Sequence, residues 1–185
     1  MPDYPASMLH AFRKSLERHP EKPCLLFEGE TWTYGRLWDE AARWAGALEA
    51  WGIRPGDRAG LYLDNVPEFV AAYLGIQLAG AIVVLVNTQY RQVELRHILG
   101  DAEVRLCVTD LQRWKELAGV EGDLPALEAV VLLDTAPGRR QEPAGAADPA
   151  ARRVAVVDSG VLLGVGGPRS RELPTSEAIA VIGYT

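Results

Sequence analysis

Between residues 58 and 133 the chain alternates short apolar runs with longer segments of helical spacing. The apolar runs are almost continuous, as expected for strands covered on both faces of a parallel sheet, and lie at 58–63, 81–86, 104–109 and 128–133. The segments between them are typical of helices and lie at 66–79, 91–100 and 111–118. Parallel neighbours need a crossover between them, which these helices supply. The sequence therefore predicts an α/β fold with a largely parallel sheet and flanking helices.

The residues before this alternating region predict two helices separated by a hairpin. Apolar side chains recur at helical spacing in 7–18, and the segment 23–34 indicates two short strands joined around Gly29. A longer helix is expected over 34–51. Its apolar stripe consists of Leu37, Ala41, Trp44, Leu48 and Trp51. This stripe favours packing of the helix on the core, and it makes core packing a better explanation of the tryptophans than base stacking.

Residues that cap helices mark the predicted boundaries. Ser7 and Thr33 precede the first two helices and are good N-caps. Gly52 follows the second helix, where a left-handed residue commonly ends a helix. Asn65 is expected to cap the helix at 66–79, with Pro67 in its first turn.

The remaining part of the chain is less regular. Segment 134–153 is rich in Ala, Pro, Gly and Arg and predicts a surface loop, whereas 154–163 indicates a short strand and a helical turn. The final residues, 178–185, predict a buried strand. We interpret the chain as a single domain with four parts: 1–57, 58–133, 134–175 and 176–185.

Charge and composition exclude several classes of protein. The formal net charge of −6, with no cluster of Lys and Arg, argues against a nucleic-acid-binding surface. The N-terminus does not resemble a signal peptide and no apolar run is long enough to span a membrane, so we expect a cytoplasmic protein. Cys24 and Cys107 each lie in an apolar run, which predicts two buried free thiols rather than a disulfide or a metal site.

No catalytic or metal-binding constellation is recognisable from the residues alone. The glycine-rich segment 164–168 does not open a helix as a dinucleotide fingerprint would. None of His10, His19 and His97 has a partner at metal-ligand spacing. No serine lies in the Gly-x-Ser-x-Gly motif of an esterase. We therefore predict no catalytic residue and no metal ligand in this chain.

A series of motifs in residues 31–110 nevertheless resembles the N-terminal region of the adenylate-forming acyl-CoA synthetases. The motifs occur in the order of that family: "TY" at 33–34, "PGDR" at 55–58, "NVPEF" at 65–69, "AGA" at 79–81, Asn87, "EL" at 94–95 and "HIL" at 97–99. The resemblance weakens through 134–175 and returns at "AVIGYT", 180–185. Two departures are Leu85, where the family usually has proline, and Gly183, where it usually has a bulkier residue.

The resemblance implies an ATP-dependent acid–CoA ligase. Members of the family join a carboxylic acid to CoA through an acyl-adenylate, with ATP, Mg²⁺ and CoA as the other participants. By resemblance, Thr185 is the first threonine of the loop that binds the ATP phosphates. Gln89 and Arg91 lie near the position of an arginine that contacts the CoA nucleotide in some members, so the resemblance makes them candidates for that contact.

The resemblance also implies that most of the catalytic machinery lies beyond residue 185. The three lysines, Lys14, Lys22 and Lys115, match none of the family's catalytic positions. We therefore expect the isolated chain to bind none of these ligands, to be inactive alone, and to pack against the missing C-terminal portion of the synthetase. The sheet surface that would meet that portion should be apolar and uncovered, so a homodimer through this face is expected.

Two alternatives stay open at this point. The first is a non-catalytic binding or scaffold module that pairs with a separate chain. The second is an unrelated α/β nucleotide-binding domain.

Overall fold

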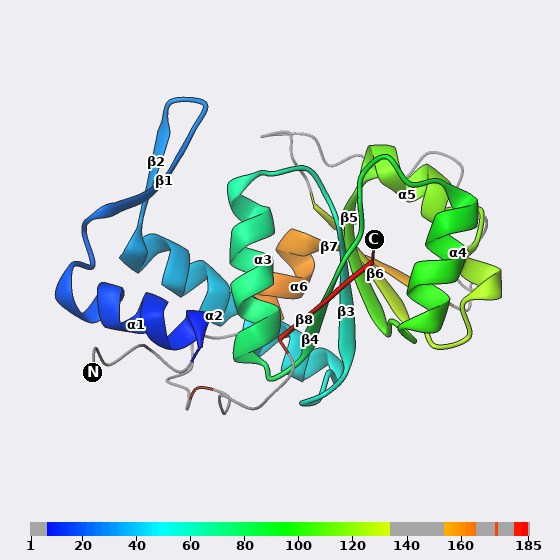
Figure 1. The fold of residues 1–185 in the computed structure, drawn as a ribbon, viewed down its shortest axis with the longest axis horizontal. Coiled ribbons are helices and arrows are strands. Elements are labelled where there is room, and N and C mark those ends of the chain that lie inside the picture. Colours follow the sequence, from blue (N-terminus) through cyan, green and yellow to red (C-terminus); the bar gives the residue numbers. More distant parts are fainter. Residues whose placement is uncertain (1–6, 134–153, 166–172, 174–179, 185) are drawn as a thin grey trace.

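The computed structural model describes residues 7–133, 154–165, 173 and 180–184 (Figure 1). The first elements are helix α1 (Met8–Arg18), strands β1 (Pro23–Phe27) and β2 (Glu30–Thr33), and helix α2 (Tyr34–Trp51). Strands β1 and β2 form an antiparallel hairpin that projects from the rest of the molecule in Figure 1. The order of helix, hairpin and helix that the sequence predicts is confirmed.

The main sheet has six strands in the order β7-β6-β5-β3-β4-β8. Their bounds are Arg58–Tyr62 for β3, Ile82–Leu85 for β4, Leu106–Asp110 for β5, Ala129–Leu133 for β6, Ala155–Asp158 for β7 and Val181–Gly183 for β8. Every pairing between neighbouring strands of this sheet is parallel. The predicted α/β fold with a parallel sheet is confirmed.

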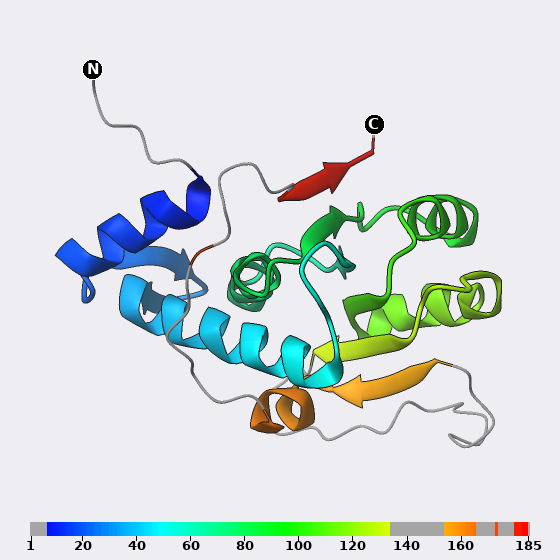
Figure 2. The same ribbon diagram turned by 90° about the horizontal axis from the view of Figure 1, so that it is seen from below.

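The crossover helices lie on opposite faces of the sheet. They are α3 (Pro67–Leu78), α4 (Gln92–Asp101), α5 (Leu111–Ala118) and α6 (Ser159–Val165), with a short 3₁₀ turn, η1, at Glu121–Asp123. The path from β3 to β4 runs in one direction along the sheet, and the paths from β4 to β5 and from β5 to β6 run in the other. Right-handed crossovers in opposite directions put their helices on opposite faces. Figure 2 shows α4 and α5 on one side, and α1, α2, α3 and α6 on the other.

Alternation along the strands separates two apolar cores. In β3 and the residue after it, Ala59, Leu61 and Leu63 join the core that contains α1, α2, α3 and α6. Tyr62 joins the other core, with α4 and α5. Gly60 faces this second core as well, where a Cβ atom would lie 3.2 Å from the Cys107 sulfur. Because successive side chains of a strand point to opposite faces, one short strand supplies both cores.

At the amino edge of the sheet, arginines join the beginnings of several strands. The Arg105 guanidinium is paired with the carboxylates of Asp57 and Glu128. The Arg58 guanidinium donates to the carbonyl oxygen of Ala102 at 2.7 Å and pairs with Glu103 at 2.7 Å. Asp57 and Arg58 belong to the "PGDR" motif, so part of that motif serves to fix the strands at this edge.

Most of the predicted caps are confirmed. The Ser7 hydroxyl accepts from the backbone N–H of His10, and the Thr33 hydroxyl accepts from that of Arg36. Gly52 ends α2 with φ +103°, a left-handed conformation that glycine adopts without a steric penalty.

Four local expectations are wrong, each for a physical reason. Strand β8 was expected to be buried, but its residues are partly buried or exposed, because it is the last strand at one side of the sheet. Val66, not Asn65, is the N-cap of α3, because the residue before Pro67 must be extended and the helix starts at the proline. Trp51 is 37% exposed, since it lies in the last turn of α2 with one side toward solvent. Cys24 is only partly buried, because the projecting hairpin carries it, whereas Cys107 is buried. Both thiols are free, as predicted.

Some predicted features cannot be followed. The segment 134–153 and most of 164–168 lie outside the described residues, and the division of the chain into four parts stays a prediction. Within the described ranges, no helix combines the length and the apolar character needed to cross a membrane.

Helices α2 and α3 cross in direct backbone contact at Gly75. A Cβ atom on this glycine would lie 2.3 Å from the Trp44 Cβ and 2.8 Å from the Ala41 carbonyl oxygen. Both distances are shorter than van der Waals contact. Gly75 therefore allows α2 to pack closely on α3. Because α2 does not connect two strands of the main sheet, this contact with α3 helps to hold it on that face of the sheet.

We expect Gly75→Ala to lower the free energy of unfolding by about 1–3 kcal/mol, because overpacking at a fixed crossing outweighs the gain in helix propensity. Gly122→Ala is the matched control, since a Cβ there meets nothing within 4 Å. Urea denaturation, monitored by tryptophan fluorescence, gives the free energy of unfolding of both variants. The close crossing is contradicted if Gly75→Ala is as stable as Gly122→Ala.

Candidate functional site

The carboxyl ends of the parallel strands bring several loops to one edge of the sheet. The connection after β3 leads to α3 on one face, and the connection after the neighbouring β5 leads to α5 on the other. Such a switch in direction opens a crevice, which is where ligands of open α/β sheets usually bind. The loop after β4 and the end of β8 lie beside each other at the same edge, because β4 pairs with β8. This edge is therefore the candidate site.

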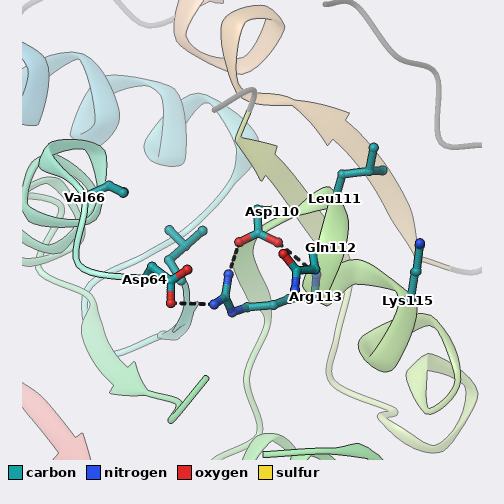
Figure 3. A pocket seen from close by; sticks show the side chains of 8 residues that line it. Asp64, Val66, Asp110, Leu111, Gln112, Arg113 and Lys115 are labelled. Carbon is teal, nitrogen blue, oxygen red and sulfur yellow. Dashed lines mark hydrogen bonds and ion pairs between the residues drawn. The ribbon is translucent and has the colours of Figure 1, made fainter. Parts of the chain in front are cut away.

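The crevice between the ends of β3 and β5 has a volume of about 470 Å³. It is lined by Leu63, Asp64, Val66, Asp110, Leu111, Gln112, Arg113 and Lys115. Figure 3 shows the Arg113 side chain extended between Asp64 and Asp110, with Leu111 and Lys115 on the side of the crevice away from Asp64. Apolar and charged groups of both signs thus line the crevice.

Arg113 bridges the two loops through ion pairs. One terminal nitrogen is 2.5 Å from Asp64 Oδ1 and the other contacts Asp110 Oδ2. Asp110 also caps α5, because its other oxygen accepts from the Arg113 backbone N–H at 2.8 Å. Burial lowers the pKa of the Arg113 guanidinium, but its hydrogen bonds and ion pairs with the two carboxylates raise it by more, so the group stays charged. Arg113 is therefore occupied by the protein's own carboxylates rather than free to bind an anion.

Tyr62 connects the crevice to the loop after β4. Its hydroxyl donates to the carbonyl oxygen of Tyr90 at 2.7 Å. Burial raises the pKa of this hydroxyl, although the charge of Arg91 acts in the opposite direction. Tyr62 thus remains a neutral donor at physiological pH and holds the loop against the end of β3.

The two residues predicted to contact a CoA nucleotide lie in this loop. The Gln89 backbone N–H donates to the Asn87 side chain at 2.9 Å, and the Gln89 side chain is exposed. One terminal nitrogen of Arg91 donates to the carbonyl oxygens of Thr88, Gln89 and Tyr90. The Arg91 side chain is 58% exposed and lies 3.7 Å from Glu116. The loop is therefore ordered by its own polar groups, and both predicted residues are at its surface.

The third predicted residue, Thr185, lies outside the described residues. The preceding residue, Tyr184, is described, and its hydroxyl donates to Asp101 Oδ2 at 2.7 Å. The end of β8 is thereby joined to α4.

The predicted absence of a metal site is not tested by the described residues, although they contain no group of three or more His, Cys, Asp or Glu side chains that could hold a metal ion. His97 lies near the end of β8, where its ring contacts that of Tyr184. Sequence reasoning missed Arg113, Asp64 and Asp110, because they come together only when β3 and β5 are paired. The signal that could have found them is a charged residue directly after each of two apolar runs.

We expect Arg113→Met to lower the free energy of unfolding by about 1–3 kcal/mol, because it leaves the mostly buried Asp110 carboxylate without its cationic partner. Arg96→Met is the matched control: its pair with Asp123 is exposed on both sides, and such pairs contribute about 0–1 kcal/mol. Thermal and urea unfolding measure both. Equal losses in the two variants would contradict a special role for the Arg113 bridge.

Curated proteins similar to this chain include fatty-acid–CoA ligases and two surfactin synthase subunits of Bacillus subtilis. The chain is 31% identical over 120 residues to a medium/long-chain-fatty-acid–CoA/3-oxocholest-4-en-26-oate–CoA ligase of Mycolicibacterium smegmatis, a match that covers 65% of this chain and 22% of the relative. It is 36% identical over 95 residues to a long-chain-fatty-acid–CoA ligase of Bacillus subtilis, covering 51% of this chain and 17% of the relative. The matches thus span less than a quarter of the length of either relative.

The fold is shared with solved ligase structures. The crystal structure of an anthranilate–CoA ligase in complex with anthranoyl-AMP superimposes with a TM-score of 0.82 at 23% identity, covering 98% of this chain and 32% of that protein. The sequence model of the AMP-binding enzyme family matches residues 12–185. This match includes all of the main sheet and the edge that carries the candidate site. The chain therefore belongs to the AMP-binding enzyme family.

Proposed function

We propose that this chain is the N-terminal part of an ATP-dependent acid–CoA ligase. In the first step, a carboxylate oxygen of the acid attacks the α-phosphorus of ATP, an acyl-adenylate forms and pyrophosphate leaves. In the second, the sulfur of CoA attacks the acyl carbonyl carbon and AMP leaves. Acyl-CoA, AMP and pyrophosphate are the products.

The observation that carries this proposal is the position of β8. The strand pairs with β4 and its carboxyl end points toward the same edge as the crevice and the loop 86–91. A loop that follows such a strand lies where phosphate groups commonly bind in parallel α/β sheets. We propose that Thr185 begins this loop and that its hydroxyl contacts the ATP phosphates.

The same reasoning supports a subsidiary role for the loop after β4. Gln89 and Arg91 are exposed beside the proposed ATP site, and their backbone is fixed by Asn87 and by the Arg91 side chain. We propose that Gln89, with Arg91 beside it, contacts the nucleotide part of CoA. On the family resemblance alone, we propose that the Mg²⁺ that accompanies ATP is held by parts of the full-length protein outside these 185 residues.

The acid remains defined only by its class. The similar curated proteins include ligases of fatty acids and of 3-oxocholest-4-en-26-oate, and a protein of similar fold is an anthranilate–CoA ligase. We propose a small-molecule carboxylic acid as the substrate and the cytoplasm as the location. A homodimer through an exposed apolar face also stays a prediction, to be checked by sedimentation of the isolated chain. A non-catalytic module that pairs with a separate chain is the competing proposal.

We expect the 185-residue chain to show no ATP–pyrophosphate exchange with fatty or aromatic acids, whereas the full-length protein that contains these residues is active. The reason is that the loop proposed to bind phosphate begins only at Thr185. Radiolabelled pyrophosphate exchange measures both proteins. ATP–pyrophosphate exchange by the isolated chain would contradict the proposal. Restoration of activity by a separately expressed partner chain would favour the competing proposal of a non-catalytic module.

In the full-length protein we expect Gln89→Ala to raise KM for CoA roughly three- to tenfold, because one hydrogen bond to a charged ligand is lost, with KM for ATP unchanged. Lys14→Ala is the control, because Lys14 is an exposed residue of α1 and belongs to none of the loops at the candidate site. Steady-state kinetics of acyl-CoA formation give KM for CoA in both variants. Equal KM values for CoA in Gln89→Ala and Lys14→Ala would exclude the contact.

A further inference from the structure

Strand β8 makes few backbone contacts with the rest of the sheet. It has three residues, Val181–Gly183, and pairs with β4 along one edge only. The Val83 backbone N–H also donates to the carbonyl oxygen of Ala180 at 3.0 Å. These contacts fix the register of the strand. They do not fix the direction of the chain after its last paired residue, Gly183, because no Cβ restricts a glycine backbone.

Tyr184, directly after this glycine, makes two contacts with α4. Its hydroxyl donates to Asp101 Oδ2 at 2.7 Å, and its ring meets the ring of His97 edge-on, with 6.3 Å between the centroids. The side chain also packs against the core on the α4 side of the sheet. A residue 83 positions later in the chain is thus joined to the last residue of α4.

Helix α4 is a firm support for this contact. Leu95, Ile98 and Leu99 are each at most 4% exposed and fix the helix on the sheet. Burial, and then the hydrogen bond and the negative charge of Asp101, raise the pKa of the Tyr184 hydroxyl to about 12. The hydroxyl therefore remains a proton donor across the physiological range of pH.

We propose that Tyr184 is a positioning residue whose hydrogen bond to Asp101 sets the direction in which the chain leaves β8, and so the placement of the phosphate-binding segment that follows. This inference rests on the proposed function. The group that touches ATP is Thr185 and the residues after it, whereas Tyr184 acts through them. A displacement of about 1 Å in a group that positions a substrate can reduce the rate by about a hundredfold, so such a fixed direction matters.

The first test uses the full-length protein and three variants that separate the bond from the side chains. Tyr184→Phe removes the donor and Asp101→Ala removes the acceptor, so each should raise KM for ATP in pyrophosphate exchange roughly three- to tenfold. Asp101→Asn retains an acceptor oxygen and should stay within about twofold of the wild type. The double variant Tyr184→Phe/Asp101→Ala should have a KM for ATP no higher than that of the more impaired single variant, since both substitutions remove the same hydrogen bond.

Tyr73→Phe is the matched control, because it removes a tyrosine hydroxyl on α3, on the face of the sheet opposite to Tyr184, and should leave KM for ATP unchanged. KM for the acid should stay constant in every variant if the effect is confined to ATP. A purely structural role would lower the thermal stability and the amount of active enzyme without changing KM. Unchanged KM for ATP in Tyr184→Phe, or effects that multiply in the double variant, would overturn the inference.

The second test uses the 185-residue chain and needs no activity. Hydrogen exchange of the backbone amides at 181–184 should be faster in Tyr184→Phe and Asp101→Ala, and unchanged in Asp101→Asn and Tyr73→Phe. Equal exchange in all variants would overturn the contact itself. Failure of the proposed function is distinguishable from failure of this inference. In that case the wild-type full-length protein would show no ATP–pyrophosphate exchange, whereas the hydrogen exchange of the amides at 181–184 would still differ between the variants.

Discussion

The common direction of the six strands in the main sheet is the constraint on which the rest of this structure depends. Each parallel strand must be followed by a connection that returns across a face of the sheet, and right-handed crossovers determine which face is used. The reversal between β3 and β5 therefore divides the helices into two layers and the apolar side chains into two cores. The same reversal creates the crevice at the carboxyl edge.

The two edges of the sheet are stabilised in different ways. At the amino edge, Arg58 and Arg105 join the strands to one another through carbonyl and carboxylate groups. At the carboxyl edge, Arg113 and Tyr62 fix the loops, while the side chain of Gln89 stays exposed. The contacts at the amino edge thus stabilise the fold. The carboxyl edge combines fixed backbones with reachable side chains, which is the arrangement a binding site needs.

Much of the fold could be predicted, because its signals are local. Helix α2 begins after Thr33 and ends at Gly52, as the sequence predicts, since capping depends on residues close in sequence. Trp51 was expected in the core on helical spacing alone, but spacing does not tell how far along a helix its neighbours extend. The site was less accessible to prediction. The resemblance pointed to Gln89 and Arg91, whereas the Arg113 bridge and the Tyr184 contact join residues 49 and 83 positions apart.

By itself, the sequence determined the succession of strands and helices, most of their caps and the family to which the chain is similar. These follow from apolar periodicity, backbone preference and the order of short motifs, all of which act over a few residues. Only the tertiary structure decided the strand order, the close crossing at Gly75 and the groups that meet at the carboxyl edge. The physical reason is that pairing in a parallel sheet depends on the packing of distant crossovers, and no local pattern specifies which strand ends become neighbours.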